Sequence, residues 1–129
     1  MITAHSYKFT KSEKLCNIKE ISSLFKGESL FNYPFKIAYS IKKDSAHSTS
    51  TPVKVLCSVG KRYSKSAVKR NLIKRRTREA YRLNKHILYS NIDNQMVSLA
   101  FIYIAHKEES YEQIQKSISK SLQKISELL

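Results

Sequence analysis

The sequence predicts an α+β fold, a single-domain α-β sandwich with elements in the order α-β-β-α-β-α. Residues 34–41 and 53–59 have the composition of strands, and residues 96–105 form a nearly continuous apolar run. Apolar residues recur at helical spacing before the first strand, between the last two strands and after the third. Three strands covered by helices suit a chain of 129 residues, and we place one domain at residues 1–129.

The first helix follows an irregular N-terminal segment. Residues 1–16 show no periodicity, and we expect them to be flexible. Asn17 and Glu20 have the spacing of a capping box, which predicts the start of a short helix, and Gly27 ends it. One side of this helix carries the apolar residues Ile18, Ile21, Leu24 and Phe25.

The three predicted strands differ in how they are covered. The polar segment at residues 42–52 has no periodicity, which predicts a hairpin connection between the first two strands. Apolar residues alternate through residues 53–59, as they do in a strand with one buried face. The apolar run at residues 96–105 follows a polar loop at 89–95 and favours a central strand covered on both faces.

Two longer helices complete the order. After a basic loop at residues 60–65, the pattern predicts a helix over residues 66–85, about five turns long. Ser110 and Gln113 form a second capping box, which opens the last helix. The apolar stripe of that helix comprises Ile114, Ile118, Leu122, Ile125 and Leu129.

Several classes of protein are excluded by composition. No apolar run approaches the roughly 18–20 residues of a membrane span, and the first residues lack the pattern of a signal peptide. Cys16 and Cys57 are too few for a disulfide scaffold and belong to no Cys-x-x-Cys pair. We therefore expect reduced thiols and a cytoplasmic location. The four histidines lack the spacing of zinc ligands.

The positive charge is concentrated in one segment. The chain has 24 Lys and Arg against 10 Asp and Glu, a formal net charge of +14. Residues 61–85 hold eleven of the basic residues, all six arginines among them, and one acid, Glu79. Because the planar guanidinium of Arg bonds phosphate through two donors, this clustering predicts contact with nucleic acid.

The predicted basic helix has two distinct sides. An α-helix advances about 100° per residue, which gathers one set of residues on a flank that can pack against the sheet. This flank comprises Ile73, Thr77, Ala80, Tyr81 and Asn84. A neighbouring arc presents a ridge of donors to phosphate and comprises Asn71, Lys74, Arg75, Arg78, Arg82 and Lys85.

A specific resemblance lies in this helix. Residues 67–79 read Ala-Val-Lys-Arg-Asn-Leu-Ile-Lys-Arg-Arg-Thr-Arg-Glu. This segment resembles the signature helix of the protein subunit of bacterial ribonuclease P, whose pattern is Ala-Val-x-Arg-Asn-Arg-x-Lys-Arg-x-x-Arg-Glu. Val-Gly-Lys-Arg at residues 59–62 resembles the strand end and basic loop of that family. Leu72 stands where the family usually has a second Arg, and the loop at 63–66 lacks the family's Gly.

The resemblance implies a function and a fold. The family's ribonucleoprotein is an endoribonuclease that removes the 5′ leader of precursor tRNA, and its RNA carries the catalysis. The implied partners are the catalytic RNA and precursor tRNA, with magnesium held mainly by the RNA. No membrane contact and no obligate protein partner is inferred. The implied fold is ribosomal-protein-S5-domain-2-like, with an unusual left-handed βαβ crossover.

The acids of the chain predict no catalytic or metal-ligating residue in the protein itself. Metal-assisted hydrolysis needs clustered carboxylates, and here only Glu108 and Glu109 are adjacent. Compensation of the dipole of the last helix explains these two. What remains is RNA binding, and the predicted contacts are Lys61, Arg62, Lys65, Lys69, Arg70, Asn71, Lys74, Arg75, Arg78 and Arg82.

The resemblance also implies a cleft for the single-stranded leader between the sheet and the first helix. The candidates are Phe25, Phe35, Lys36 and Tyr39, because an aromatic ring stacks on any base. Burial in the core is the competing interpretation for Phe25 and Phe35. Tyr39 is favoured for the cleft, because its ring can stack while its hydroxyl stays in water. Ile21 stands where the family often has Phe.

Other interpretations of the basic helix stay open. A structural RNA-binding protein, such as a ribosomal protein, would use the same surface. A DNA-binding regulator needs a preceding helix and tight turn or a dimer seam, whereas here a strand and a loop come first. A nuclease with its own site is disfavoured by the sparse carboxylates. A peripheral membrane protein is disfavoured because the apolar flank lacks Trp, Phe and Leu at helical spacing.

Overall fold

The computed structural model describes residues 14–15, 18–43, 53–92 and 95–129. Most of the N-terminal segment expected to be flexible lies outside these residues, as do Asn17 and positions 44–52 of the expected hairpin connection. None of the helices within the described ranges is long and apolar enough to cross a membrane.

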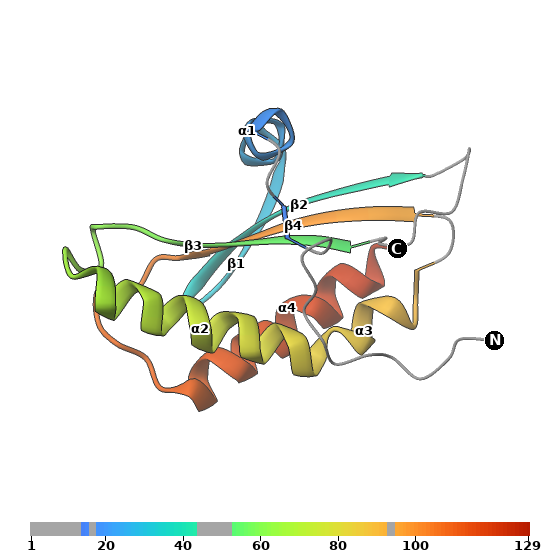
Figure 1. Cartoon of the computed structure of the whole chain (residues 1–129). Coiled ribbons are helices and arrows are strands. Elements are labelled where there is room, and N and C mark those ends of the chain that lie inside the picture. The colour runs from blue at the N-terminus through green and yellow to red at the C-terminus, as the bar shows by residue number, and fades with distance from the viewer. Residues whose placement is uncertain (1–13, 16–17, 44–52, 93–94) are drawn as a thin grey trace.

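The described residues form one four-stranded sheet with helices on both faces, which confirms the α+β class. The strand order is β1-β2-β4-β3, in which β3 runs parallel to β4 and the other neighbours are antiparallel. Figure 1 shows α1 on one face and α2, α3 and α4 on the other. The elements are α1 (Ile18–Lys26), β1 (Glu28–Asn32), β2 (Phe35–Lys43), β3 (Val53–Val59), α2 (Ala67–Asn84), α3 (His86–Tyr89), β4 (Gln95–Tyr103) and α4 (Tyr111–Glu127).

The predicted order α-β-β-α-β-α was wrong in two elements. It lacked β1, which is a short edge strand whose side chains are mostly exposed and therefore show no apolar alternation. It also lacked the single turn of α3, which lies where the end of the basic helix and a polar loop were expected. The predicted hairpin was wrong as well, because β4 lies between β2 and β3.

The main core lies between the sheet and the layer of α2, α3 and α4. Alternate residues of β2, β3 and β4 point into it, and the apolar stripe of α4 packs against them as predicted. The position of β4 between two strands confirms that it is central. The largest fully buried side chains of the main core include Phe35, Ile37, Tyr81, Phe101, Ile114, Ile118 and Leu122.

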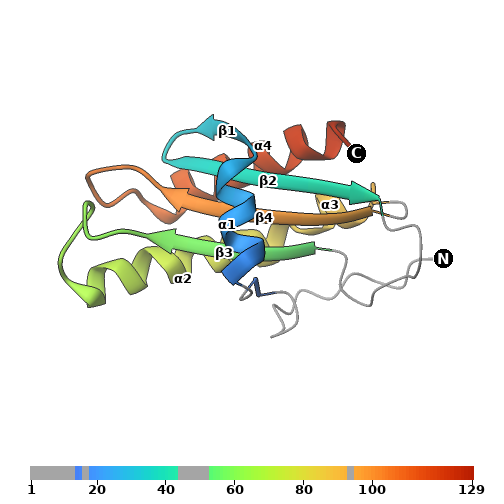
Figure 2. The ribbon, with the colours of Figure 1, turned by 90° about the horizontal axis from the view of Figure 1, so that it is seen from above.

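The opposite face of the sheet carries only a small cluster beneath α1. Leu24 of α1 is buried with Leu15, Ala38 and Ala100, and Ile21 packs against them. The two alanines leave room for the helix to approach the strands closely. Figure 2 shows α1 crossing the middle of the sheet, so that strand surface extends on either side of the helix.

Serine residues cap the starts of α2 and α4, and the cap at Ser110 was predicted. The Ser66 side chain accepts a hydrogen bond from the Lys69 backbone N–H at 3.4 Å. Ser110 accepts one from the Gln113 backbone N–H at 3.3 Å. Both serines have extended backbone dihedrals, as N-cap residues do. These bonds satisfy amide donors that a helix start would otherwise leave unpaired.

Candidate nucleic-acid interface

Helix α2 has the buried flank that its periodicity predicted. Its buried residues are the five expected there, Ile73, Thr77, Ala80, Tyr81 and Asn84. Thr77 and Asn84 satisfy their side chains within the helix, since each donates to the carbonyl four residues earlier at 2.8 Å. The flank therefore accepts two polar residues without leaving their donors unpaired.

The predicted ridge lies on the neighbouring flank of α2. Asn71 and Arg75 of the ridge are exposed, as is the predicted contact Lys69, and Lys74 and Arg78 are partly covered. Lys74 and Arg78 lie close enough to Cys57 of β3 to favour its thiolate, although burial raises the pKa of that thiol to about 12. The ridge thus runs along the side of the molecule where β3 forms the sheet edge.

Two predicted members of the ridge have partners in the protein. Lys85 was placed on the exposed arc, but it is 4% exposed, and its ammonium lies 5.4 Å from the centre of the Tyr89 ring. It is the residue at which α2 ends and α3 begins, so the helical arc no longer applies there. Arg82 is bound to Glu79 on the same helix, and its Nε donates to that carboxylate at 2.9 Å. This hydrogen bond lowers the pKa of Glu79.

The basic loop between β3 and α2 is shaped by its own hydrogen bonds. The Tyr63 backbone N–H donates to the Gly60 carbonyl at 3.2 Å, and the Ser66 backbone N–H donates to the Ser64 hydroxyl at 3.1 Å. Arg70 reaches back from α2 and donates to the Ser64 carbonyl at 2.8 Å. The loop holds three exposed cations, Lys61, Arg62 and Lys65. Arg70 therefore shapes the loop, a role that the sequence did not indicate.

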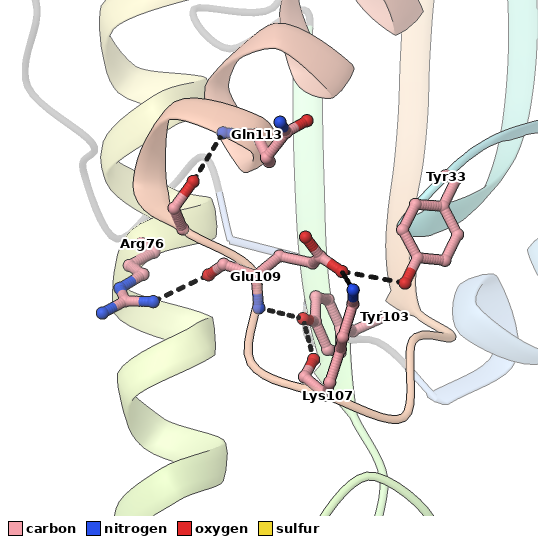
Figure 3. A network of polar contacts seen from close by, with 7 residues as sticks. Tyr33, Arg76, Tyr103, Lys107, Glu109 and Gln113 are labelled. Carbon is pink, nitrogen blue, oxygen red and sulfur yellow. Dashed lines mark hydrogen bonds and ion pairs between the residues drawn. The ribbon is translucent and has the colours of Figure 1, made fainter.

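Arg76 points away from the ridge, toward the loop that precedes α4. Its guanidinium donates to the Glu109 carbonyl at 2.7 Å (Figure 3). It also lies 3.2 Å from the Glu108 carboxylate. Glu109 also accepts a hydrogen bond from the Tyr33 hydroxyl at 2.8 Å. The adjacent carboxylates are thus engaged by the protein itself, and the described residues contain no group of three potential metal ligands.

A hollow of about 260 Å³ opens on the α1 face of the sheet, where the sequence placed a cleft. Two predicted leader-binding residues lie in it: Phe25 of α1, which is 49% exposed, and Lys36 of β2. The rest of the lining consists of Ser29, Ala38, Ser58 and Ile102.

Phe31 of β1 is an aromatic beside this hollow that the sequence analysis missed. It pairs with Lys36 across the strands, and the Lys36 ammonium lies 5.8 Å from the centre of its ring. The ring is 65% exposed. Recognition of β1 as a strand would have placed Phe31 and Ser29 on the same face, because alternate residues of a strand share a face.

The other two leader-binding predictions were wrong about the face of the sheet. Phe35 is 1% exposed and packs edge-on against Phe101 and Tyr103, with ring centres 6.0 and 5.6 Å away. Tyr39 lies on the same side of β2 as Phe35, pairs with Leu99 and packs against the main core. Both side chains point away from α1, because they are an even number of residues apart and odd-numbered residues of β2 face the helix layer.

The hollow and the basic loop lie at the same end of the sheet. Phe31, Lys36, Ile102 and Ser58 form one row across the four strands. Ser58 is followed by Val59, the last residue of β3, and the basic loop comes next. A strand of nucleic acid in the hollow would therefore be adjacent to the loop cations.

Comparisons with known proteins bear on this combination of fold, ridge and hollow. The family model for ribonuclease P matches residues 9–126. The chain belongs to the ribonuclease P family. Its relatives include the ribonuclease P protein component of Porphyromonas gingivalis, which is 31% identical over 129 residues, or 98% of this chain and 92% of the relative. The component from Chlorobaculum tepidum is 40% identical over 78 residues, covering 56% of this chain and 51% of that one.

A solved structure of the ribonuclease P family has the same fold. The ribonuclease P protein of Staphylococcus aureus matches with a TM-score of 0.63 and 26% identity, over 90% of this chain and 96% of that one. Membership of the family confirms the resemblance drawn from residues 67–79 and the predicted role as the protein component of a tRNA-processing ribonucleoprotein. It also sets aside the alternative of a ribosomal protein.

Proposed function

We propose that the chain binds the catalytic RNA of ribonuclease P through α2 and the basic loop, and the 5′ leader of precursor tRNA in the hollow beside α1. The observation that carries this proposal is the division of α2. One flank is buried in the core, and the next presents cations beside a preformed basic loop. Such a surface neutralises phosphates, and it requires no reacting group of its own.

The proposal assigns the chemistry to the RNA. The paired carboxylates of the chain are bound to Arg76 and Tyr33, and no described residues form a group suited to hold magnesium. The magnesium ions that hydrolyse the phosphodiester would accordingly be held mainly by the RNA. Cations of the protein would lower the repulsion among phosphates near these ions, which reduces the magnesium concentration that the RNA requires.

The leader would lie across the row that Phe31 and Lys36 begin. An exposed aromatic ring stacks on a base of any identity, and the Lys36 ammonium can meet a phosphate. Phe25 of α1 provides a second ring in the lining of the hollow. A site without hydrogen-bond readout of the bases suits leaders of variable sequence. No obligate protein partner is needed for these contacts, and the activity would take place in the cytoplasm.

The direct test is reconstitution. Purified protein is mixed with a bacterial ribonuclease P RNA, and cleavage of precursor tRNA is measured over a magnesium series. We expect no cleavage by the protein alone, and cleavage by the mixture at lower magnesium than by the RNA alone. Robust cleavage by RNA-free protein, or no effect of the protein on the magnesium requirement, would contradict the proposal.

The salt dependence of RNA binding tests the ridge. Affinity for the catalytic RNA should fall linearly on a log–log plot, with a slope of roughly 0.7 to 0.9 per phosphate engaged. Replacing Arg75 and Arg78 with Ala should reduce that slope by about 1.4 to 1.8. The charge-matched control replaces Lys116 and Lys120 of α4, which are exposed on a different helix. Equal changes in both variants would mean that net charge alone, and not the ridge, sets the binding.

A further inference from the structure

Glu109 contacts three separate parts of the molecule (Figure 3). Its carboxylate accepts a hydrogen bond from Tyr33, in the turn between β1 and β2, at 2.8 Å. Its carbonyl accepts one from Arg76 of α2 at 2.7 Å. Its backbone N–H donates to the hydroxyl of Tyr103, at the end of β4, at 2.9 Å. One residue therefore joins the β1–β2 turn to the helix that carries the cationic ridge.

The backbone of Glu109 is held firmly by its neighbours. The Tyr103 hydroxyl accepts from Glu109 and donates to the Lys107 carbonyl at 2.7 Å, which closes the loop after β4. The Tyr103 ring in turn packs edge-on against Tyr63 of the basic loop, with ring centres 5.3 Å apart. The basic loop, the end of β4, the loop after it and α2 thus form one connected unit. This unit fixes the position of the Glu109 carboxylate.

The two partners of the hydrogen bond between Tyr33 and Glu109 differ in how far they are exposed. The Glu109 side chain is only 12% exposed, whereas Tyr33 is 59% exposed. The Tyr33 ring is therefore not held by burial in the core, and its hydroxyl is the group that ties it to Glu109. On the other side of the turn, the Ile104 backbone N–H donates to the Pro34 carbonyl at 2.9 Å. On the β1 side, Asn32 exchanges hydrogen bonds with Ser117 of α4, at 3.1 and 2.7 Å. The Tyr33 hydroxyl adds the tie that leads to Glu109 and through it to α2.

The turn that Tyr33 occupies also determines where one wall of the hollow lies. Phe31 precedes Tyr33 by two residues, Lys36 follows it by three, and the two are paired across the strands. β1 is an edge strand, with β2 as its only sheet neighbour among the described residues. A turn free to shift would move the Phe31 ring relative to the basic loop.

We infer that Tyr33 and Glu109 are positioning residues, whose hydrogen bond holds the Phe31–Lys36 wall of the hollow at a fixed place relative to the basic loop and α2. This inference rests on the proposed function and extends it. A leader can contact both the hollow and the loop cations only when the distance between these two sites matches the length of single-stranded RNA that joins them. Discrimination between precursor and mature tRNA therefore depends on this hydrogen bond.

The test compares holoenzymes assembled with variant proteins. Tyr33→Phe removes only the donor, and Glu109→Ala removes the side-chain acceptor together with its ion pair with Lys107. We expect each to weaken binding of leader-bearing precursor tRNA about two- to tenfold, the range of one hydrogen bond. Binding of mature tRNA, the saturating single-turnover cleavage rate and the melting temperature of the protein should stay within about twofold or a few degrees of wild type.

Three further variants make the result specific. Glu109→Gln keeps an acceptor oxygen and should retain most of the precursor affinity. Glu127→Ala removes one exposed carboxylate at the end of α4 and controls for the change in net charge. The double variant Tyr33→Phe with Glu109→Ala should be no weaker than the weaker single variant, because the two side chains act through one bond.

Several outcomes would overturn the inference. Unchanged precursor affinity in both single variants would do so, as would independent, multiplying effects in the double variant. Equal losses for precursor and mature tRNA would show a general structural role instead. A wild-type holoenzyme that fails to cleave would contradict the proposed function itself, which separates that failure from a failure of the positioning role.

Discussion

The two faces of the sheet differ in the size of the side chains that cover them. On the helix-layer face, β2 contributes Phe35, Ile37 and Tyr39 to a large core. On the α1 face, the same strand contributes Ala38 and Ser40, and β4 contributes Ala100 and Ser98 in register with them. One face is packed by three helices, whereas among the described residues the other is covered by α1 and by Leu15 beside it.

This difference separates the stability of the fold from the proposed binding of substrate. Large side chains on one face supply most of the apolar burial, so the opposite face can stay open without loss of the fold. Small side chains beside α1 leave the hollow, and the rings of Phe25 in its lining and Phe31 beside it remain exposed. Each strand of the sheet serves both purposes, because its residues alternate between the faces.

The largest effect should come from the packed face. Phe35→Ala removes a ring that is 1% exposed and lies between Phe101 and Tyr103. We expect the free energy of unfolding to fall by about 3–5 kcal/mol, as measured by urea denaturation. RNA binding and precursor binding should be lost together as the fold weakens. A stable variant with a defect only toward the leader would show that Phe35 belongs to the cleft and not to the core.

A smaller and more selective effect should come from the open face. Phe31→Ala removes a ring that is 65% exposed, so the free energy of unfolding should change by less than about 0.5 kcal/mol. Precursor affinity of the holoenzyme should fall by about 1–3 kcal/mol, the cost of one lost stacking contact. Mature tRNA, which has no leader, serves as the control ligand. Tyr39→Ala should behave like Phe35→Ala, with a smaller loss of stability and no selectivity for the leader.

The smallest effect concerns the thiol on the packed face. Burial raises the pKa of Cys57 to about 12, so about one thiol in ten thousand is ionised at pH 8. In a Cys16→Ser background, alkylation of the native protein at pH 8 should be slow and should become fast in denaturant. The same shift makes folding stability fall as pH rises from the unfolded value near 8.5 toward 12. Fast native labelling at pH 8 would contradict the raised pKa of Cys57, because the residue is only partly buried.

Local patterns predicted α2 well because helical periodicity involves only neighbouring residues. All five residues expected on its buried flank are buried, and Ser66 caps it. The strand at residues 53–59 has the bounds that its alternation indicated. Lys85 was misplaced because the periodic pattern continued past the residue at which α2 ends.

The misassigned leader-binding residues follow from a family resemblance that was set above a local pattern. β2 alternates large apolar residues at positions 35, 37, 39 and 41 with small or polar ones at 36, 38, 40 and 42, so its alternation already favours burial of the set that contains Phe35 and Tyr39. That set is the one that the helix layer covers, and Lys36 belongs to the other. The pattern of β2 does not say which helices cover each face, because α2 and α4 are distant in sequence.

By itself, the sequence determined the class of fold, the basic helix with its two flanks, and the family, because each depends on the spacing of residues that are close together in the sequence. The tertiary structure alone decided the rest. It placed β4 between β2 and β3, made an edge strand of β1, and turned Arg76 away from the ridge toward Glu109. These features are contacts between segments far apart in the chain, such as the one between Tyr33 and Glu109, which lie 76 positions apart, and no local pattern encodes such a contact.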